Sequence, residues 1–509
     1  MHMVCQTSRN VSTTTHSRIL QLFVTLVLSL NLYALPLFAQ ETKQVRGVIH
    51  LDSTISGGEM GPEELVRFLK ENELEVAIFT DQITTNVHYG FFPFPAFTEW
   101  LSNKLAASKF GRESSVSTFG ADNYLSLLRD LDRKYSDMTV IAGVEAFPFY
   151  YWRENLLRGQ ITMVDGHKHL LAIGLEQPSD YENMPTLGEG FFRAYNLQSL
   201  LSLWPFALFI FAFKCYLQSK RAERPALFKI PALIFLIVGG LFLLNNYPYK
   251  FGRYDAYHGD QGPRPYQDFV DYVIGRGGLV FWAHPEASKD QTYAMGPLTV
   301  NMQTEAPYKD MLEVYNYTGF AAFFEGMKYI IPPGGIWDQV LTEYCFGQRA
   351  RPIWAIAEGD VEGDGFDPGL SQTVFLVKEH TRKAMLTALR TGQIYAIAGP
   401  FADDLSLDTF TLSDDEGKQV GMGQTLESKA VHLVANIRLN GNEKRNSLSA
   451  DLIKNGLLIQ TFKGNGQINI DLQDTIDGTN RHHYYRLDVR GPNQTRLISN
   501  PIFAHATDS

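Results

Sequence analysis

The chain is poor in cysteine, with three in 509 residues. Cys5 and Cys215 lie beside apolar segments and Cys345 stands alone, so the sequence offers neither a disulfide framework nor a cysteine metal site. An excess of positive charge is also lacking, because the net charge is −10. Nucleic-acid binders usually carry a basic stripe, and we therefore expect no nucleic-acid partner.

Two common catalytic motifs are missing as well. The sequence has no G-x-S-x-G nucleophile elbow and no G-x-x-x-x-G-K-S/T phosphate loop, which argues against serine-hydrolase and P-loop chemistry. Internal repeats and low-complexity tracts are absent too. A hydrophobic fraction of 45% and a charged fraction of 20% are typical of a globular protein, and this length predicts two to four units.

Apolar segments predict a membrane protein. Basic residues and then an apolar run at 19–38, with Leu37-Phe38-Ala39 as a cleavage site, predict that residues 1–40 are a signal peptide or an N-terminal anchor. Two further apolar runs, at 197–217 and 227–244, predict a transmembrane hairpin over 196–248. A buried hairpin in a soluble protein is the alternative, but apolar side chains cover all faces of both helices.

The link between the two runs predicts the orientation of the hairpin. Four basic residues oppose the single acid Glu223, namely Lys220, Arg221, Arg224 and Lys229. The positive-inside rule places such a link in the cytoplasm. We therefore expect the rest of the chain on the extracytoplasmic, periplasmic side, with the membrane as a partner through 197–244.

Residues 41–195 and 249–400 alternate strand-like and helix-like segments. Short apolar runs of the buried parallel-strand kind lie at 76–80, 138–142, 170–174, 278–282, 312–315 and 352–357. Helical patterns lie at 124–135, 266–275 and 381–391, and another helix begins at Gly61-Pro62. Alternation of this sort predicts an α/β barrel or doubly wound sheet, with the hairpin inserted into it.

After residue 400 the sequence no longer alternates strand-like and helix-like segments. Strand candidates at 405–412, 431–439, 449–453, 467–472, 484–489 and 496–502 are separated by turn signals such as Asn440-Gly441. No helix of useful length appears among them. Residues 401–509 therefore predict a small β-sandwich.

Imidazoles and carboxylates recur at the ends of the predicted barrel strands. These residues are His50, Asp52, Asp81, Glu145, His167, His169, His284, Asp360 and Glu362, and the amide Gln82 follows Asp81. Such groups are the usual ligands of divalent ions. His50 and Asp52 are two apart on a strand and should share one face, as should Asp360 and Glu362. For His167 the alternative is a solvated side chain, because His169 lies on the opposite face of the strand that follows.

These motifs resemble the PHP (polymerase and histidinol phosphatase) superfamily of metal-dependent hydrolases. The matching segments are His50-x-Asp52-Ser53-Thr54, Ser56-Gly57-Gly58, Pro62-Glu63-Glu64-Leu65, Thr80-Asp81-Gln82, Gly143-Val144-Glu145, His169-Leu170-Leu171, Ala283-His284-Pro285, Glu313-Val314-Tyr315-Asn316 and Asp360-x-Glu362. The tail, from Ala384-Met385-Leu386 to Ser499-Asn500-Pro501-Ile502, is similar to the carbaryl-hydrolase-like branch. The resemblance covers most of residues 46–505.

The resemblance implies a distorted (βα)7 barrel with two divalent metal ions, Mn, Zn or Fe. The implied metal ligands are His50, Asp52, Glu145, His169, His284, Asp360 and Glu362, and the implied catalytic residues are Glu145, His284 and Asp360. Glu145 would bridge the two ions. The chain departs from the family at Asp52, Gln82 and Glu362, where the family has histidine.

The resemblance implies that a metal-activated water cleaves a phosphoester or a carboxylic or carbamic ester of a small molecule. The alternative is a catalytically degenerate barrel that binds a ligand or a partner, which the three departures motivate. Aromatic segments at 89–97 and 320–324 could wall an apolar pocket at the barrel mouth. They could equally pack on the hairpin or enter the bilayer interface.

Overall fold

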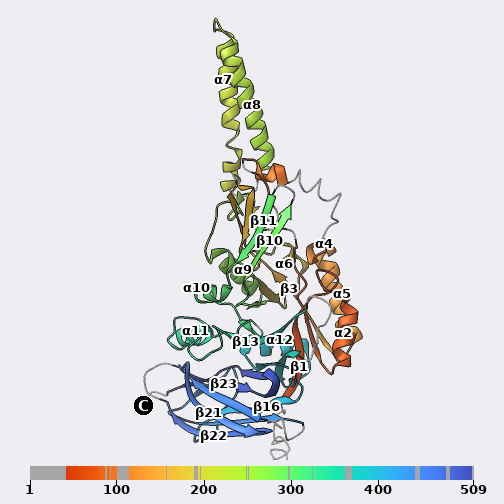
Figure 1. Cartoon of the computed structure of the whole chain (residues 1–509), viewed down its shortest axis with the longest axis vertical. Helices are drawn as coiled ribbons and strands as arrows, with labels where there is room; N and C mark the ends of the chain where they lie inside the picture. Colours follow the sequence, from red (N-terminus) through yellow and green to blue (C-terminus); the bar gives the residue numbers. More distant parts are fainter. Residues whose placement is uncertain are drawn as a thin grey trace, which may run out of the picture. The chain divides into compact units, whose positions relative to one another are not determined.

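The computed structural model describes residues 42–85, 87, 89–91, 93–99, 114–155, 158–187, 193–194, 197–247, 249, 251–295, 298–323, 325–361, 370–441, 447–476 and 482–506 (Figure 1). The chain divides into one unit at Met1–Thr42 and another at Lys43–Ser509. The leader expected at 1–40 lies outside the described residues, and the fold below is that of the second unit.

Seven strands close into a barrel, in agreement with the α/β prediction. In spatial order they run β13-β12-β9-β6-β3-β2-β1, and the pairing of β13 with β1 closes the ring. Their bounds are β1 Lys43–Leu51, β2 Val76–Phe79, β3 Thr139–Ala146, β6 Leu170–Ile173, β9 Leu279–Trp282, β12 Gly319–Phe323 and β13 Trp354–Val361.

One barrel strand runs against the others. β6 pairs antiparallel with both β3 and β9, whereas every other neighbouring pair in the ring is parallel. The amino end of β6 therefore lies beside the carboxyl ends of β3 and β9, with Leu171 opposite Glu145 and Leu170 opposite Trp282. This direction brings the residue before β6 to the mouth of the barrel, where the carboxyl ends of the parallel strands meet.

Strand residues alternate between two hydrophobic cores, as the period of two requires. Ile78 and Ile141 belong to one core, which α12 completes, while Ala77 and Val140 belong to the other core with the remaining helices. Because both faces are covered, the strands are continuous apolar runs. The helices are α2 Pro62–Glu71, α4 Val116–Phe119, α5 Ala121–Lys134, α6 Pro178–Glu182, α9 Arg264–Gly275, α10 Asp310–Glu313, α11 Ile336–Cys345 and α12 Arg382–Thr391, together with 3₁₀ turns at Pro307–Lys309 and Pro492–Gln494.

The strand predicted at 312–315 is wrong. That segment contains the end of α10, and the barrel strand β12 begins later, at Gly319. A short apolar run alone does not separate a helical turn from a strand. The aromatic segment 320–324 was expected to wall a pocket, pack on the hairpin or enter the bilayer interface, but Phe320 and Phe323 lie in β12 and are buried.

The C-terminal region consists of strands, most of them antiparallel. β14 Ser371–Val377 pairs with residues 43–47 of β1, so a sheet ordered β14-β15-β24-β23-β20-β21 continues from the barrel. A second sheet is ordered β17-β16-β19-β22, and residues of both sheets share one hydrophobic core. The remaining bounds are β15 Ile394–Ala398, β16 Leu405–Ser413, β17 Gln419–Val420, β18 Thr425–Glu427, β19 Ala430–Leu439, β20 Ser447–Lys454, β21 Leu457–Asn465, β22 Gln467–Thr475, β23 His482–Arg490, β24 Arg496–Ser499 and β25 Ile502–His505.

A separate sheet is built from the segments that follow β3 and β9. Its order is β10-β11-β5-β4, with bounds β4 Tyr151–Asn155, β5 Gln160–Val164, β10 Lys289–Met295 and β11 Leu298–Thr304. Two short strands, β7 Arg193–Ala194 and β8 Phe251–Gly252, pair with each other at the two ends of the predicted hairpin. The hairpin therefore leaves the barrel and returns to it at one place.

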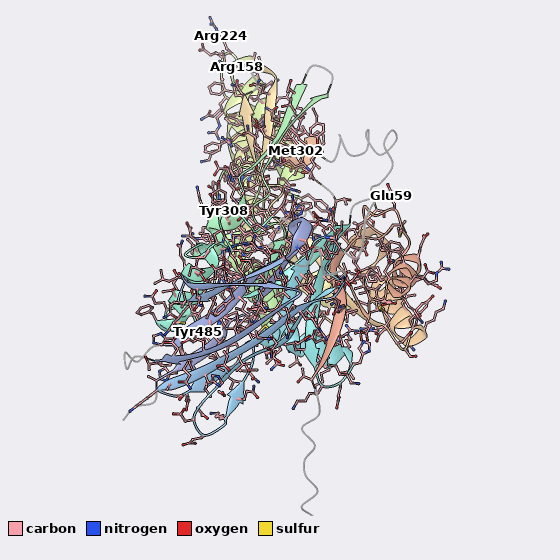
Figure 2. All side chains as sticks on the ribbon, turned by 60° about the horizontal axis from the view of Figure 1, so that its bottom comes forward. Glu59, Arg158, Arg224, Met302, Tyr308 and Tyr485 are labelled. Atoms are coloured by element: carbon pink, nitrogen blue, oxygen red, sulfur yellow. The ribbon has the colours of Figure 1, made fainter. Side chains whose placement is uncertain are left out.

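The two apolar runs form adjacent helices, which lie side by side in Figure 1. A 3₁₀ segment, η2 Leu197–Leu203, leads into α7 Phe206–Ser219, and α8 Ala226–Asn246 follows a link that contains Arg224, labelled in Figure 2. Ser199–Ser219 and Ala226–Asn246 are long and apolar enough to cross a membrane, and in each the most apolar 18-residue stretch is only 11% buried. This exposure argues against the alternative of a buried hairpin.

Candidate metal centre

Most of the predicted ligands come together at the barrel mouth. Glu145 lies near the end of β3, His169 immediately before β6, and His284 two residues after β9. Ligand atoms of these three residues all lie within 4.8 Å of one another, and the same holds for a second group of His50, Asp52 and Glu145. All five side chains are buried.

A single oxygen of Glu145 joins the two groups. Its Oε1 lies 2.6 Å from His169 Nδ1, 3.4 Å from His284 Nε2 and 3.3 Å from His50 Nε2. His169 Nδ1 and His284 Nε2 are 3.1 Å apart. Two nitrogens bound to one tetrahedral ion at about 2.0–2.1 Å would lie roughly 3.3 Å apart, so the spacing of these two imidazole nitrogens suits coordination of a common cation.

Strained backbone aims several of these side chains. His50, His284 and Asp360 have positive φ angles of 72°, 28° and 47°. The register of β1 against both neighbours shifts between Ile49 and Leu51, which marks a bulge at His50. A bulge re-aims a side chain locally. His50 and Asp52 thus reach one site through a bulge and the residues after the strand, and not through the simple alternation expected from their spacing.

Asp360 lies at the exposed edge of the second group. Its Oδ1 lies 3.9 Å from His50 Nε2, and its side chain is 46% exposed. Asp52 Oδ2 lies 4.0 Å from the same nitrogen. Glu362, the other acid predicted at this strand end, lies outside the described residues. The roles of Asp360 and Glu362 as ligands stay predictions.

Glu358 is a site residue that the sequence analysis missed. It lies in β13 with an exposed fraction of 3%. One carboxylate oxygen lies 3.0 Å from His50 Nδ1, and the other accepts a hydrogen bond of 2.8 Å from the backbone N–H of His284. Such second partners fix the ring orientation of metal-binding histidines. The sequence did contain one signal for Glu358, which is that this acid directly follows the apolar run 352–357.

The charged side chains at the barrel mouth shift one another's pKa values. Burial opposes the charged form of Glu145, but the neighbouring imidazoles of His169 and His50 outweigh it and hold the pKa of Glu145 well below its usual value. Burial would lower the pKa of His284, but its hydrogen bond to Glu145 and the charge of Glu358 raise that pKa to about 9. Burial raises the pKa of Asp52 well above the ordinary value.

Several buried side-chain atoms at the site make no hydrogen bond to the described residues, although charged groups lie near them. His50 Nε2, Asp52 Oδ2 and His284 Nδ1 lack a hydrogen bond within the described part of the chain. Buried polar atoms are normally paired, because an unpaired one costs free energy. The first two of these atoms belong to the group around Glu145 Oε1. The donor set therefore fits a divalent cation.

The remaining predicted residues lie around this centre. Asp81 is buried, and its Oδ1 accepts hydrogen bonds from the backbone N–H and hydroxyl of Ser53 and from the Ser56 hydroxyl. Gln82 forms a backbone bridge with Glu145. His167, for which a solvated side chain was the alternative, is partly buried, and its ring stacks on His284 at a centroid distance of 4.8 Å.

Comparisons with known proteins add a likeness in fold only. No family model matches the chain, and no curated protein matches it. A two-domain protein from Bacteroides vulgatus, described as containing a PHP-like metal-dependent phosphoesterase, is 11% identical, with a TM-score of 0.33 over 91% of this chain and 95% of its own.

Two further solved structures are similar. A protein from Bifidobacterium adolescentis, described as a metal-dependent phosphoesterase, is 16% identical, with a TM-score of 0.25 over 63% of this chain and 88% of its own. An amidohydrolase from Chromobacterium violaceum is 14% identical, with a TM-score of 0.26 over 63% of this chain and 89% of its own.

Proposed function

We propose that the chain is a metal-dependent hydrolase of the PHP type, tethered to a membrane, that cleaves a phosphoester or a carboxylic or carbamic ester. One observation carries the proposal. A single carboxylate oxygen, Glu145 Oε1, lies within 3.4 Å of three buried imidazole nitrogens that come from different segments of the barrel. Isolated charges are not buried in this way without a partner that offsets their desolvation.

The chain's own residues would hold the cations and position the substrate. His169, His284 and Glu145 form one donor set, and His50, Asp52 and Glu145 form the other, with Asp360 at its edge. Bound divalent ions would supply a water of lowered pKa and polarise the substrate oxygen under attack. Glu358 would keep the His50 ring in place, so that Nε2 is directed toward Glu145.

The orientation and domain organisation belong to the same proposal. The basic link between α7 and α8 supports a cytoplasmic hairpin tip, with the barrel on the periplasmic side. We also infer that the two C-terminal sheets, which share a hydrophobic core, form a β-sandwich over 401–509. The sandwich contributes none of the residues of the two ligand groups.

Metal analysis and turnover together test the function. The full chain is purified in detergent, stripped of metal and reloaded separately with Mn²⁺, Zn²⁺ and Fe²⁺. Each form is then assayed on chromogenic phosphate and carboxylate esters. We expect about two ions per chain and activity with at least one metal. The Glu145→Gln variant should lose both the bound metal and the activity. Asp451→Asn alters a buried carboxylate of the C-terminal sheet, paired with Arg490, and should keep both. Wild-type protein without metal or activity would instead favour the degenerate binding barrel.

A further inference from the structure

One loop connects the metal centre to the base of the hairpin. At its start, Ile83 donates a backbone hydrogen bond of 2.9 Å to the carbonyl of Glu145. Further along, the backbone N–H groups of Ala96 and Phe97 donate to Asn245 Oδ1, at 3.0 and 3.3 Å. Asn245 lies in the last turn of α8. The base of the hairpin therefore contacts the loop that begins at the barrel mouth.

Aromatic rings mark where the hairpin would leave the bilayer. Phe242 of α8 contacts Phe94 of the loop at 4.8 Å and Trp204, just before α7, at 4.9 Å between ring centroids. Trp204 is 49% exposed. Tryptophan and tyrosine collect at the membrane–water interface. Phe94 shares a neighbour with Trp204, so this part of the loop would lie at the depth of the lipid head groups if α7 and α8 span a bilayer.

A packed core holds the loop against the metal centre. Ring contacts run from His169 to Phe147 at 6.1 Å, from Phe147 to Tyr150 at 6.3 Å, from Tyr150 to Trp152 at 6.0 Å and from Trp152 to Tyr89 at 4.9 Å. Phe147, Tyr150 and Trp152 are buried. Close-packed interiors deform little, so the loop and the metal centre should keep a fixed separation.

The same region exposes apolar side chains. Phe91, on the loop, is 41% exposed, and Leu197, Leu200 and Leu201 of η2 are more exposed still. Exposed apolar residues that gather beside a membrane anchor are typical of a surface that enters the head-group and acyl boundary. A hydrolase of water-soluble esters would have no need of a barrel mouth held at a fixed distance from the bilayer. Such a fixed position is useful for a substrate that resides in the bilayer.

We propose that the substrate is an amphiphilic phosphoester whose apolar tail stays in the same bilayer as α7 and α8 while its head group enters the barrel mouth. This inference rests on the proposed function, and it narrows the substrate to a lipid-like class. Hydrolysis breaks the bond between phosphorus and the leaving-group oxygen and joins the oxygen of water to phosphorus. The leaving group departs as an alcohol with one proton of that water, and the other proton is released. No further reactant is required.

The test compares two esters that differ only in their tails. The full chain, reconstituted in phosphatidylcholine vesicles with the metal that gives most activity, receives hexadecyl or ethyl 4-nitrophenyl phosphate. Release of nitrophenolate is followed by absorbance. We expect kcat/KM for the hexadecyl ester to exceed that for the ethyl ester by at least tenfold. Equal values would overturn the inference and leave the proposed function intact, whereas hydrolysis of neither ester would overturn both.

Two variants separate a bilayer effect from a simple apolar preference of the pocket. Phe91→Asp places a charge on the exposed part of the loop and should lower the ratio of hexadecyl to ethyl turnover several-fold. Leu458→Asp, on strand β21, replaces a residue of similar exposure, 49%, and should leave that ratio unchanged. An unchanged ratio in Phe91→Asp would count against the bilayer-resident substrate.

Discussion

Glu358 offers the sharpest test of how the metal centre is held. Its two carboxylate oxygens serve two different donors, His50 Nδ1 at 3.0 Å and the backbone N–H of His284 at 2.8 Å. The variant Glu358→Gln keeps the shape of the side chain but leaves only one acceptor oxygen. Its amide N–H group would then face one of the two donors, so one hydrogen bond must break.

The expected cost follows from the geometry. A buried hydrogen bond to a charged group contributes about 1.5–3 kcal/mol, and every 1.4 kcal/mol corresponds to roughly a tenfold change in affinity. Because the bond lost orients a metal ligand, we expect metal affinity to fall about 10- to 100-fold, the usual range for such second partners. Competition with a chromophoric chelator measures this affinity directly.

The matched control is Asp338→Asn. Asp338 of α11 is also a buried carboxylate, and it forms an ion pair of 2.6 Å with Arg486 of β23. Neither residue belongs to the two ligand groups. This variant should lower thermal stability and leave metal affinity close to that of the wild type. Wild-type affinity in Glu358→Gln would refute the role given to Glu358. Equal losses in the two variants would show that the effect is general destabilisation.

Three further predictions concern the site and the hairpin. His284→Ala should lose metal completely by elemental analysis while folding normally by circular dichroism, and full metal content would contradict the ligand assignment. The raised pKa of His284, about 9, means that the metal-free site holds a proton at neutral pH, so metal affinity should rise as pH approaches 9. Calorimetry in buffers of different ionisation enthalpy should detect proton release at pH 7, and none would argue against this. Arg221→Cys should react with an impermeant thiol reagent only from the cytoplasmic side, and labelling from outside would reverse the proposed topology.

The periodic parts of the fold were predictable from the sequence. Buried strands such as β2 and β3 are apolar on both faces, and α5, α9 and α12 begin and end within a few residues of the expected bounds. The ligand groups were predictable too, since ligands of parallel strands gather where the strands end. His50, Asp52, Glu145, His169 and His284 all belong to these groups.

What the sequence could not predict depends on direction and on long-range pairing. A short apolar run predicts a buried strand but not whether that strand is parallel or antiparallel to its neighbours. The antiparallel direction of β6 therefore could not be predicted. Glu358 was missed because its two hydrogen-bond partners, His50 and the backbone N–H of His284, lie more than 70 positions away. Strand β21 was missed because most of its side chains are exposed and show no alternation.

The short ladder between β7 and β8 makes the helical hairpin a removable module. Arg193 pairs with Gly252 and Ala194 with Phe251, so the chain departs and returns across two neighbouring strands. A tight turn of a few residues could join them in place of the intervening helices. The truncated chain would still contain every residue of the two ligand groups. It would also yield a water-soluble barrel, suited to crystallisation, in which the chemistry could be studied apart from the lipid.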